Sequence, residues 1–413
     1  MSGYLAQELS ARGSARVIVV MRAATGTGAV ASASEGRRLF RHFSGAPVAR
    51  SSILAASLGS SAPPCRFFPY LGVLLGTADR AGVAALRSDP QVVSVGGAPA
   101  LSPIRPRHVT AARLDAERTW GIERLGVPAL WDRGITGQGV LVAHLDTGVD
   151  GRHPALAGAV AHFAEFDVMG RAVQPSPKPR DSDDHGTHTA GTIAGRPVGG
   201  RHVGVAPGAR LASAMVIEGG DAIARVLGGM DWALGLGARV LSLSLGFRGW
   251  WPDFLAVTRV LRGKGVLPVF AVGNEYAGSS RSPGNYPEAL SVGACGEDDR
   301  VADFSSSQRF DRKKDPIVPD LVAPGVGIVS AKPGGGYQAM DGTSMATPHV
   351  AGLAALLLEA EPKAKVSRLE AAILESCARP RGMSAERAGR GIPSAPKALE
   401  ALRAGLVARR GPS

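Results

Sequence analysis

The sequence lacks any apolar run long enough to cross a membrane. It has 413 residues, of which 45% are hydrophobic, but the longest apolar stretches are interrupted by Gly, Arg or Pro, whereas a membrane-spanning helix needs roughly 18 or more apolar residues. No export signal is visible either, because Glu8, Arg12 and Arg16 precede only a very short apolar run. We therefore expect no transmembrane helix and no membrane partner. The location expected is cytoplasmic, unless the start codon has been assigned too far downstream.

Cysteine is scarce as well. Cys65, Cys295 and Cys377 are few, odd in number and far apart, so one disulfide is possible but is not suggested, and the pattern agrees with an intracellular protein. None of the three has metal-ligand spacing. We interpret them as small buried hydrophobic residues, so the sequence predicts no cysteine-based metal centre.

Charged residues are also few, at 20% of the chain, yet the net charge is +12. The basic excess lies at the two ends, in residues 1–120 and 379–413, and is almost entirely arginine. These arginines neither form a continuous run nor alternate with aromatic residues, which make up only 5% of the chain. This pattern is typical of a solvated surface rather than a nucleic-acid interface, and we expect no nucleic-acid partner.

Short strand and helix signals alternate in the first hundred residues. The predicted strands are 16–22, 66–76 and 91–95, and residues 78–88 are predicted as a helix that Asp89-Pro90 ends. Residues 24–36 have no period and are predicted to be a loop. Residues 1–100 should therefore form a small α+β domain.

The run from Leu101 to Arg118 contains Pro103, Pro106 and four arginines and has no clear core face. We interpret residues 101–119 as a linker at a domain boundary.

Strand and helix signals then alternate over residues 120–405. The predicted strands are nearly continuous apolar runs at 140–145, 211–217, 240–245, 266–272 and 289–294. Such strands are buried on both faces, and the helical segments 221–236 and 253–262 supply crossovers between them. The expected fold class is α/β, a doubly wound and mostly parallel sheet. Residues 406–413 should be a frayed tail.

The stretch GTSMATPHVAG at 342–352 joins a Gly-Thr turn to apolar residues at helical spacing that continue to Leu358. Pro348 is tolerated only near a helix start, so the helix should begin close to Ser344. Serine is a common helix cap, and this stretch alone leaves a capping role and a nucleophilic role for Ser344 about equally favoured.

Two further stretches, HLDTGVD at 144–150 and DHGTHTAG at 184–191, place polar residues among small ones. A serine hydroxyl is a poor nucleophile unless an imidazole accepts its proton. His185 can fill that role, and Asp146, which follows a predicted strand, can orient the imidazole. Residues alone thus predict a doubly wound α/β protein with a candidate Ser-His-Asp site.

His188 lies three residues after His185 and could in principle complete a metal pair. There is no His-Glu-x-x-His pattern, and we interpret Asp181, Asp183 and Asp184 as negative charge at a helix N-terminus. A structural histidine is the favoured interpretation of His188, and the sequence predicts no metal site.

Taken together, the motifs resemble those of the subtilisin-like serine proteases, the subtilases. The resemblance runs from about Gly121 to Leu402 and is carried by DTGVD at 146–150, HGTHTAG at 185–191, SLG at 244–246, VGN at 272–274 and APGVGIVSAKPGGGYQAMDGTSMATPHVAG at 323–352. It implies a serine endopeptidase in which Ser344 attacks a peptide carbonyl, His185 is the general base and acid, and Asp146 orients His185. Asn274 would then donate to the oxyanion.

The resemblance also implies a substrate site. Ser244, Leu245, Gly246 and Gly273 would form the backbone walls of the primary specificity pocket, where the glycines leave room for a substrate side chain. The substrate would be a protein or peptide bound as an extended strand. Phe247, Trp250 and Trp251 follow directly and either line a further subsite or form a lid on the core.

The resemblance also implies a role for the N-terminal domain. The segment TADRAGVAALRSDPQVVSV at 77–95 resembles the inhibitor-type prodomain of subtilases, which implies an intramolecular inhibitor and self-cleavage between about Leu101 and Arg118. The chain would then be a zymogen, and both a broad degradative role and a dedicated maturation role fit these residues.

One loop distinguishes this sequence from many subtilases. The loop RPVGGRH at 196–202 has two arginines and no carboxylate where relatives carry calcium ligands, which argues against structural calcium; the chemistry itself should need no cofactor.

The alternative function is an inactive subtilase-like protein that binds peptides without turnover. The presence of all three triad residues and Asn274 argues against it.

Overall fold

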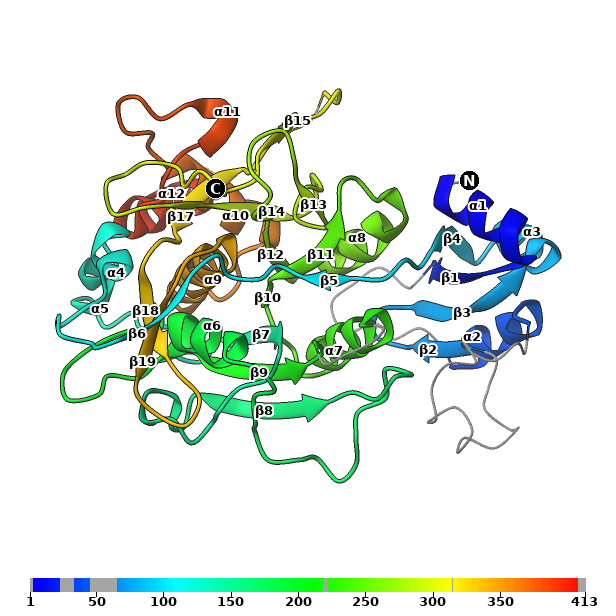
Figure 1. Ribbon diagram of the computed structural model, residues 1–413, viewed down its shortest axis with the longest axis horizontal. Helices are drawn as coiled ribbons and strands as arrows, with labels where there is room; N and C mark the ends of the chain where they lie inside the picture. Colours follow the sequence, from blue (N-terminus) through cyan, green and yellow to red (C-terminus); the bar gives the residue numbers. More distant parts are fainter. Residues whose placement is uncertain (1–2, 23–32, 45–64, 218–221, 314, 408–413) are drawn as a thin grey trace.

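The computed structural model describes residues 3–22, 33–44, 65–217, 222–313 and 315–407 (Figure 1). An N-terminal unit lies beside a larger body, and the segment that follows the unit runs along that body towards its far end. Within the described ranges, no helix is both long and apolar enough to span a membrane.

The N-terminal unit packs helices against a four-stranded antiparallel sheet with the order β2-β3-β1-β4. Its elements are α1 (Gly3–Arg12), β1 (Ser14–Met21), α2 (Ala33–Leu39), η1 (Phe40–His42), β2 (Cys65–Phe68), β3 (Val73–Asp79), α3 (Arg80–Ser88) and β4 (Val92–Gly97). A separate apolar core, which includes Leu9, Val17, Leu74 and Leu86, holds the helices to one face of the sheet.

Two predictions for this unit were wrong in detail. The run 66–76 is not one strand, because a turn that ends at Gly72, with φ of 63°, separates β2 from β3. The predicted loop 24–36 is helical from Ala33 onward, and its residues 24–32 lie outside the described part of the chain.

Residues 101–119 are more ordered than the predicted linker. They contain the strands β5 (Ser102–Pro103) and β6 (Val109–Ala112), which add to strands of the larger body. Leu101 and Ile104 are buried, because they lie against that body rather than in solvent. The expectation that this stretch has no core face was therefore wrong for Leu101 and Ile104.

The larger body is built on a seven-stranded parallel sheet with the order β17-β14-β12-β10-β7-β9-β8. Its strands are β7 (Leu141–Asp146), β8 (Val160–Glu165), β9 (Arg210–Met215), β10 (Val240–Leu243), β12 (Leu267–Ala271), β14 (Leu290–Cys295) and β17 (Leu321–Pro324). Sequence reasoning found the five inner strands and missed β8 and β17 at the two edges. The predicted doubly wound α/β fold is confirmed.

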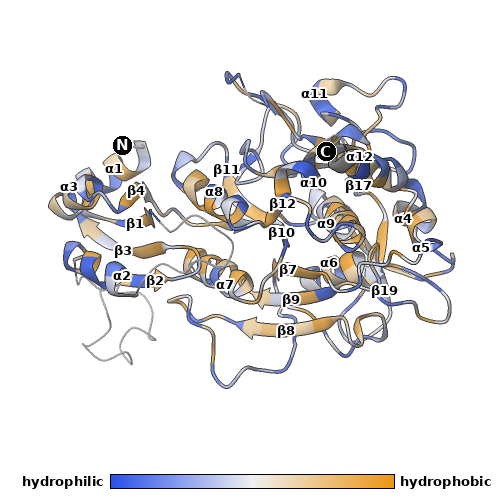
Figure 2. Ribbon diagram, turned by 180° about the vertical axis from the view of Figure 1, so that it is seen from behind, coloured by the Kyte–Doolittle hydropathy of each residue, from blue (hydrophilic) through white to orange (hydrophobic). Residues whose placement is uncertain are grey.

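Both faces of this sheet are covered. Alternate side chains of β7 belong to different cores: Val142 packs with α6 and α9 on one face, whereas Ala143 and Leu145 pack with α7 and α8 on the other. Figure 2 shows the strands of this sheet mostly in hydrophobic colours. Parallel strands that are buried on both faces read as continuous apolar runs, which is why the sequence revealed the inner ones.

The remaining elements surround this sheet. The helices are α4 (Trp120–Arg124), α5 (Pro128–Trp131), η3 (Pro154–Leu156), α6 (His185–Ala194), α7 (Ile223–Gly235), η4 (Pro252–Phe254), α8 (Leu255–Gly263), α9 (Thr343–Ala360), α10 (Val366–Glu375), α11 (Ala385–Ala388) and α12 (Ala395–Val407). The short strands are β11 (Leu245–Arg248), β13 (Arg281–Ser282), β15 (Gln308–Arg309), β16 (Ile317–Val318), β18 (Ile328–Ala331) and β19 (Tyr337–Met340). The predicted tail 406–413 was wrong at its start, since α12 includes 406 and 407; residues 408–413 lie outside the described residues.

The N-terminal unit docks onto α7 and α8 through a shared apolar core. Ile18, Phe68 and Leu71 belong to the same buried cluster as Leu227 and Val257 of the larger body. Burial of this apolar surface is the main force expected to hold the two parts together.

A carboxylate of α7 lies at this interface. Asp231 Oδ1 accepts the backbone N–H of Leu71 at 2.9 Å, and burial raises the pKa of Asp231 to about 6. A raised carboxyl pKa means that the docked state favours the protonated form. The contribution of Asp231 to the stability of the interface is therefore most favourable in acid and is lost as the pH rises from the ordinary pKa of 3.8 through about 6.

We predict that Asp231→Asn removes this pH dependence. Between pH 4.5 and pH 7.5, the Tm of the parent chain should fall by a few degrees more than the Tm of Asp231→Asn. Differential scanning calorimetry of both proteins at the two pH values measures this difference. Asp311→Asn, at an exposed carboxylate, is the matched control and should behave like the parent. Equal pH dependence in the parent and Asp231→Asn would contradict the assignment.

Candidate active site

Ser344 lies in the first turn of α9, as the sequence predicted. Gly342 precedes the helix in an extended conformation, and the Ser344 side chain is fully buried. Pro348 is accommodated within the second turn of the helix. The Thr343 backbone N–H and hydroxyl both donate to Asn274 Oδ1 at 2.9 Å, which fixes the start of the helix against the loop after β12.

Asp146 and His185 meet at the carboxyl edge of the parallel sheet. Asp146 ends β7 and His185 begins α6, and their side chains form a hydrogen bond of 2.7 Å between Asp146 Oδ1 and His185 Nδ1. The carboxylate also accepts the Thr147 backbone N–H at 2.7 Å and the Thr189 hydroxyl at 3.2 Å. Asp146 is thus held in one orientation by donors from two elements.

The two side chains shift each other's pKa. Burial alone would lower the pKa of His185, but the charge of Asp146 and its hydrogen bond outweigh burial and raise that pKa above 6.5. Burial alone would raise the pKa of Asp146, and the His185 ring instead holds it below its usual value. This arrangement favours a carboxylate that stabilises an imidazolium.

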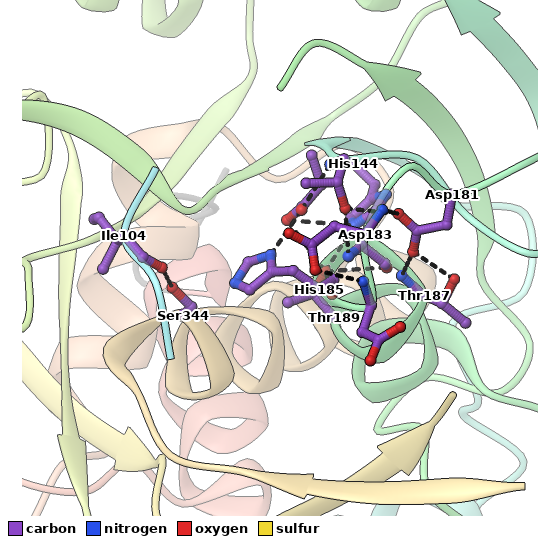
Figure 3. Close-up of polar contacts among 12 residues, drawn as sticks. Ile104, His144, Asp181, Asp183, His185, Thr187, Thr189 and Ser344 are labelled. Carbon is purple, nitrogen blue, oxygen red and sulfur yellow. Dashed lines mark hydrogen bonds and ion pairs between the residues drawn. The ribbon is translucent and has the colours of Figure 1, made fainter. Parts of the chain in front are cut away.

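Ser344 and His185 are not hydrogen-bonded to each other. The Ser344 hydroxyl donates to the backbone carbonyl of Ile104 at 2.8 Å, and His185 Nε2 is buried without a partner among the described residues. In Figure 3 the His185 ring lies on the side of its polar cluster that faces Ser344 and Ile104. The three predicted residues are therefore gathered at one site, with a peptide carbonyl from the chain itself beside Ser344.

Asn274 contacts the same segment. Its Nδ2 donates to the carbonyl of Arg105 at 2.9 Å, one residue beyond the carbonyl that Ser344 contacts. Arg105 in turn forms an ion pair of 2.9 Å with Asp183. Two peptide carbonyls in succession are thus bound by two of the predicted residues.

The segment before Ile104 forms a short antiparallel ladder on β11. Pro103 pairs with Leu245. Ser102 pairs with Gly246. Leu245 and Gly246, which were predicted to bind substrate, therefore contact an extended peptide of this chain through their backbones.

Ser244 adds a further contact. Its carbonyl accepts the backbone N–H of Ile104 at 3.1 Å. Ile104 is therefore bound by Ser244 through its N–H and by Ser344 through its carbonyl, and its side chain is almost completely buried.

Gly273 differs from the expectation that it leaves room for a substrate side chain. Its φ is 119°, and a Cβ there would lie 2.6 Å from Glu275 Oε2 and 3.2 Å from Arg281 Cγ. The space beside Gly273 is thus filled by three side chains of this chain, those of Glu275, Ser306 and Arg281.

A cavity of about 180 Å³ remains between the segment and His185. Its lining includes Ile104, Arg105, Thr147, Asp184 and Met340. The cavity thus provides space between His185 and the residues that follow Ile104, including Arg105 and Pro106.

His144 is a residue that sequence reasoning missed. Its Nδ1 is 3.0 Å from Ser213 Oγ, and its Nε2 is 2.8 Å from Thr189 Oγ1. Burial lowers the pKa of His144 to about 4, so the ring is neutral at neutral pH. It supports Thr189, which donates to Asp146. The only signal for it was its place two residues before Asp146.

His188 is held as a structural residue. Its Nε2 lies 2.8 Å from the carbonyl of Ile328, and burial lowers its pKa to about 3. Among the described residues, no group of three or more His, Cys, Asp or Glu side chains is arranged to hold a metal ion.

Of the three aromatic residues left open between a subsite and a lid, Phe247 lies in β11, and Trp250 and Trp251 follow that strand. Phe247 is buried and packs against Phe254 and Trp251, whereas Trp250 is 40% exposed. Trp251 also contacts Tyr4 of the N-terminal unit, with 5.2 Å between ring centroids. Phe247 thus belongs to the core, and Trp251 covers it at the interface.

Comparison with known proteins agrees with this geometry. Residues 137–391 match the Subtilase family. The chain is 39% identical over 247 residues to Subtilisin Savinase of Lederbergia lenta, covering 59% of this chain and 85% of that protein. It is 34% identical over 304 residues to Subtilisin E of Bacillus subtilis strain 168, covering 71% of this chain and 72% of that protein.

A third relative is M-protease of Shouchella clausii strain KSM-K16. It is 39% identical over 247 residues, and this match spans 59% of this chain but only 60% of M-protease. The family match covers more than half of the chain and contains the sites of Asp146, His185 and Ser344. The chain belongs to the subtilase family, and its residues 137–391 form a serine endopeptidase domain of that family.

Proposed function

We propose that the chain is a self-processing zymogen in which Ser344, His185 and Asp146 hydrolyse peptide bonds through an acyl-enzyme. The observation that carries this proposal is the Ser344 hydroxyl at 2.8 Å from a peptide carbonyl, in a segment that lies on β11 as an added strand. Residues 102–105 stand in for a protein or peptide substrate, which would bind the same backbone groups.

In the proposed reaction, the Ser344 hydroxyl turns from the Ile104 carbonyl oxygen to His185 Nε2, which is without a partner among the described residues. The imidazole accepts the hydroxyl proton as Oγ attacks the carbonyl carbon, and it later gives the proton to the leaving amine. Asp146 stabilises the imidazolium through the 2.7 Å bond to Nδ1. Water then attacks the acyl-enzyme by the same route, and Ser344 is restored.

Asn274 is proposed to donate to the oxyanion. Its Nδ2 lies on the neighbouring Arg105 carbonyl at 2.9 Å, and its Oδ1 is fixed by Thr343. The Asn274 amide therefore has to move from the Arg105 carbonyl to the Ile104 carbonyl to stabilise the tetrahedral intermediate. Removing such a donor costs about 10²–10³ in kcat, a magnitude known from subtilisin itself.

The bond proposed for self-cleavage is Ile104–Arg105. Ile104 is bound on both sides, by the Ser244 carbonyl and by the Ser344 hydroxyl. After the cut, residues 1–104 would remain bound as an inhibitor, because β5 still pairs with β11 and the apolar interface is unchanged. A bound product of this kind keeps other peptides out of the site.

We predict that the purified chain carries Arg105 as a new N-terminus, whereas Ser344→Ala stays intact. Intact-mass and N-terminal peptide mass spectrometry of the two proteins measure this directly. Loss of a triad serine reduces kcat by on the order of 10⁶-fold in subtilisin, so the variant should show no cut over days. A parent chain that remains uncut, or that is cut equally in both proteins, would overturn the proposal.

We predict that the acid limb of kcat/KM reports His185. The imidazole must be neutral to accept a proton, so activity should rise with pH through a pKa above 6.5. Asp146→Asn removes the charge that raises this pKa, and the limb should move to lower pH while kcat falls by on the order of 10⁴-fold. The measurement is the pH–rate profile on a peptide substrate; an unmoved limb in Asp146→Asn would exclude this pairing.

We also propose that the reaction needs no cofactor and that the loop 196–202 holds no calcium. The Arg196 guanidinium donates to the carbonyls of Ala194 at 3.2 Å, Gly158 at 3.3 Å and, from Nη1, Pro207. Carbonyl oxygens are ligands that calcium prefers, and here a fixed cationic side chain already uses them.

Accordingly, an excess of chelator should change Tm by no more than about 1 °C. Arg196→Met should lower Tm by several degrees, because it leaves these carbonyl acceptors unpaired, at a cost in stability of about 1–3 kcal/mol. Thermal unfolding with and without chelator measures both effects. A large decrease of Tm on chelation would show that calcium does stabilise the domain.

A further inference from the structure

A buried arginine outside the triad contacts the bound segment. Arg281, in β13, is 4% exposed. Arg281 and Ser282, the two residues of β13, pair with β11, the strand on which Ser102 and Pro103 lie. A charged side chain so close to a peptide-binding strand requires partners, since burying an unpaired charge is costly.

Glu275 supplies one set of partners. Its Oε1 accepts from Arg281 Nε at 2.9 Å and from Nη2 at 2.5 Å. Burial alone would raise the pKa of Glu275, but the hydrogen bond and charge of Arg281 hold it below its usual value. Glu275 is therefore a carboxylate that fixes the plane of the guanidinium.

The remaining nitrogen of Arg281 is directed at the segment. Nη1 donates to Ser102 Oγ at 2.8 Å, and its distances to the carbonyls of Ser102, Pro103 and Gly246 are longer, at 3.3, 3.4 and 3.4 Å. The shortest contact is thus to a side chain, not to the backbone. Within the described part of the chain, Ser102 Oγ itself has one weak acceptor, the Gly246 carbonyl at 3.4 Å.

Gly246 makes this contact available. It pairs with Ser102, and a Cβ at this position would meet the Ser282 carbonyl at 2.4 Å and Arg281 Cβ at 3.4 Å. The glycine lets the β13 backbone lie close to β11, which brings Arg281 within reach of the peptide that pairs with Gly246. Arg281 therefore contacts the side chain of the residue that pairs with Gly246.

We propose that Arg281 is a specificity-determining residue that selects substrates with an oxygen-bearing side chain, hydroxyl or carboxylate, two residues before the residue bound like Ile104. This inference rests on the proposed function, because it takes residues 102–105 as the path of a substrate. A carboxylate would make a charge-assisted hydrogen bond with the fixed guanidinium. An apolar side chain would leave Nη1 without its closest acceptor, and a cationic one would face a like charge.

The test uses fluorogenic peptide amides of sequence Leu-X-Pro-Ile, which copy residues 101–104, with X as Ser, Asp, Ala or Lys. The full chain as purified is assayed, and rates are divided by the concentration of sites that react with a fluorophosphonate. Ser and Asp should exceed Ala by about tenfold in kcat/KM, the loss expected for one hydrogen bond to a charged group, and Lys should be poorest.

In Arg281→Met the preference for Ser and Asp over Ala should fall to within about twofold. Because this variant leaves Glu275 unpaired, the double variant Arg281→Met/Glu275→Gln is assayed beside it and should show the same loss of preference. Arg248→Met, which removes an exposed arginine paired in register with Arg281, is the matched control and should retain the preference.

The outcomes separate this inference from the proposed function. A parent chain that reacts with the fluorophosphonate but cleaves all four peptides alike would overturn the role of Arg281, as would a preference that persists in both Arg281 variants. A parent chain that neither reacts with the probe nor cleaves any peptide, even after residues 1–104 have been removed, would instead overturn the proposed function. Self-cleavage rates of Ser102→Asp and Ser102→Ala give a second reading, and the Asp variant should be the faster.

Discussion

The contact between the Ser344 hydroxyl and the Ile104 carbonyl, at 2.8 Å, is the interaction on which the other features of this molecule converge. It requires a helix that begins at Thr343, a parallel sheet that brings Asp146 to the same edge, and a strand, β11, that accepts a peptide beside it. It also requires the N-terminal unit to be docked, because β5 follows that unit by only a few residues. Fold, site and N-terminal unit are therefore parts of one arrangement.

Electrostatics at this contact favour a site that is assembled but at rest. The Asp146–His185 pair is buried and tightly hydrogen-bonded, while His185 Nε2 has no partner among the described residues and the Ser344 hydroxyl is turned away from it. An unpartnered buried nitrogen costs free energy, which the docked segment and its interface can offset. In the proposed reaction, the Ser344 hydroxyl turns to His185 and the Asn274 amide moves from the Arg105 carbonyl to the Ile104 carbonyl.

Sequence patterns predicted the parts whose signals are local. The inner strands read as apolar runs because both faces are buried, and the turn and helix around Ser344 were predicted from local sequence. The role of Ser344 as a nucleophile came mostly from the resemblance to subtilases. Edge strands were missed: β8 contains the exposed His162, and β17 is short and ends in Pro324. Ile104, His144 and Arg281 could not be assigned, because their roles come from contacts with residues more than thirty positions away that no local period reveals.

The central claim is that Ser344 is a nucleophile activated by His185 and covered by residues 102–105. Covalent labelling of the purified chain with a fluorophosphonate, followed by peptide mapping, tests it most directly. The account predicts a single modified residue, Ser344, no labelling in His185→Ala, and slower labelling when purified residues 1–104 are added in excess. Labelling at another serine, or none even after residues 1–104 are removed, would contradict it.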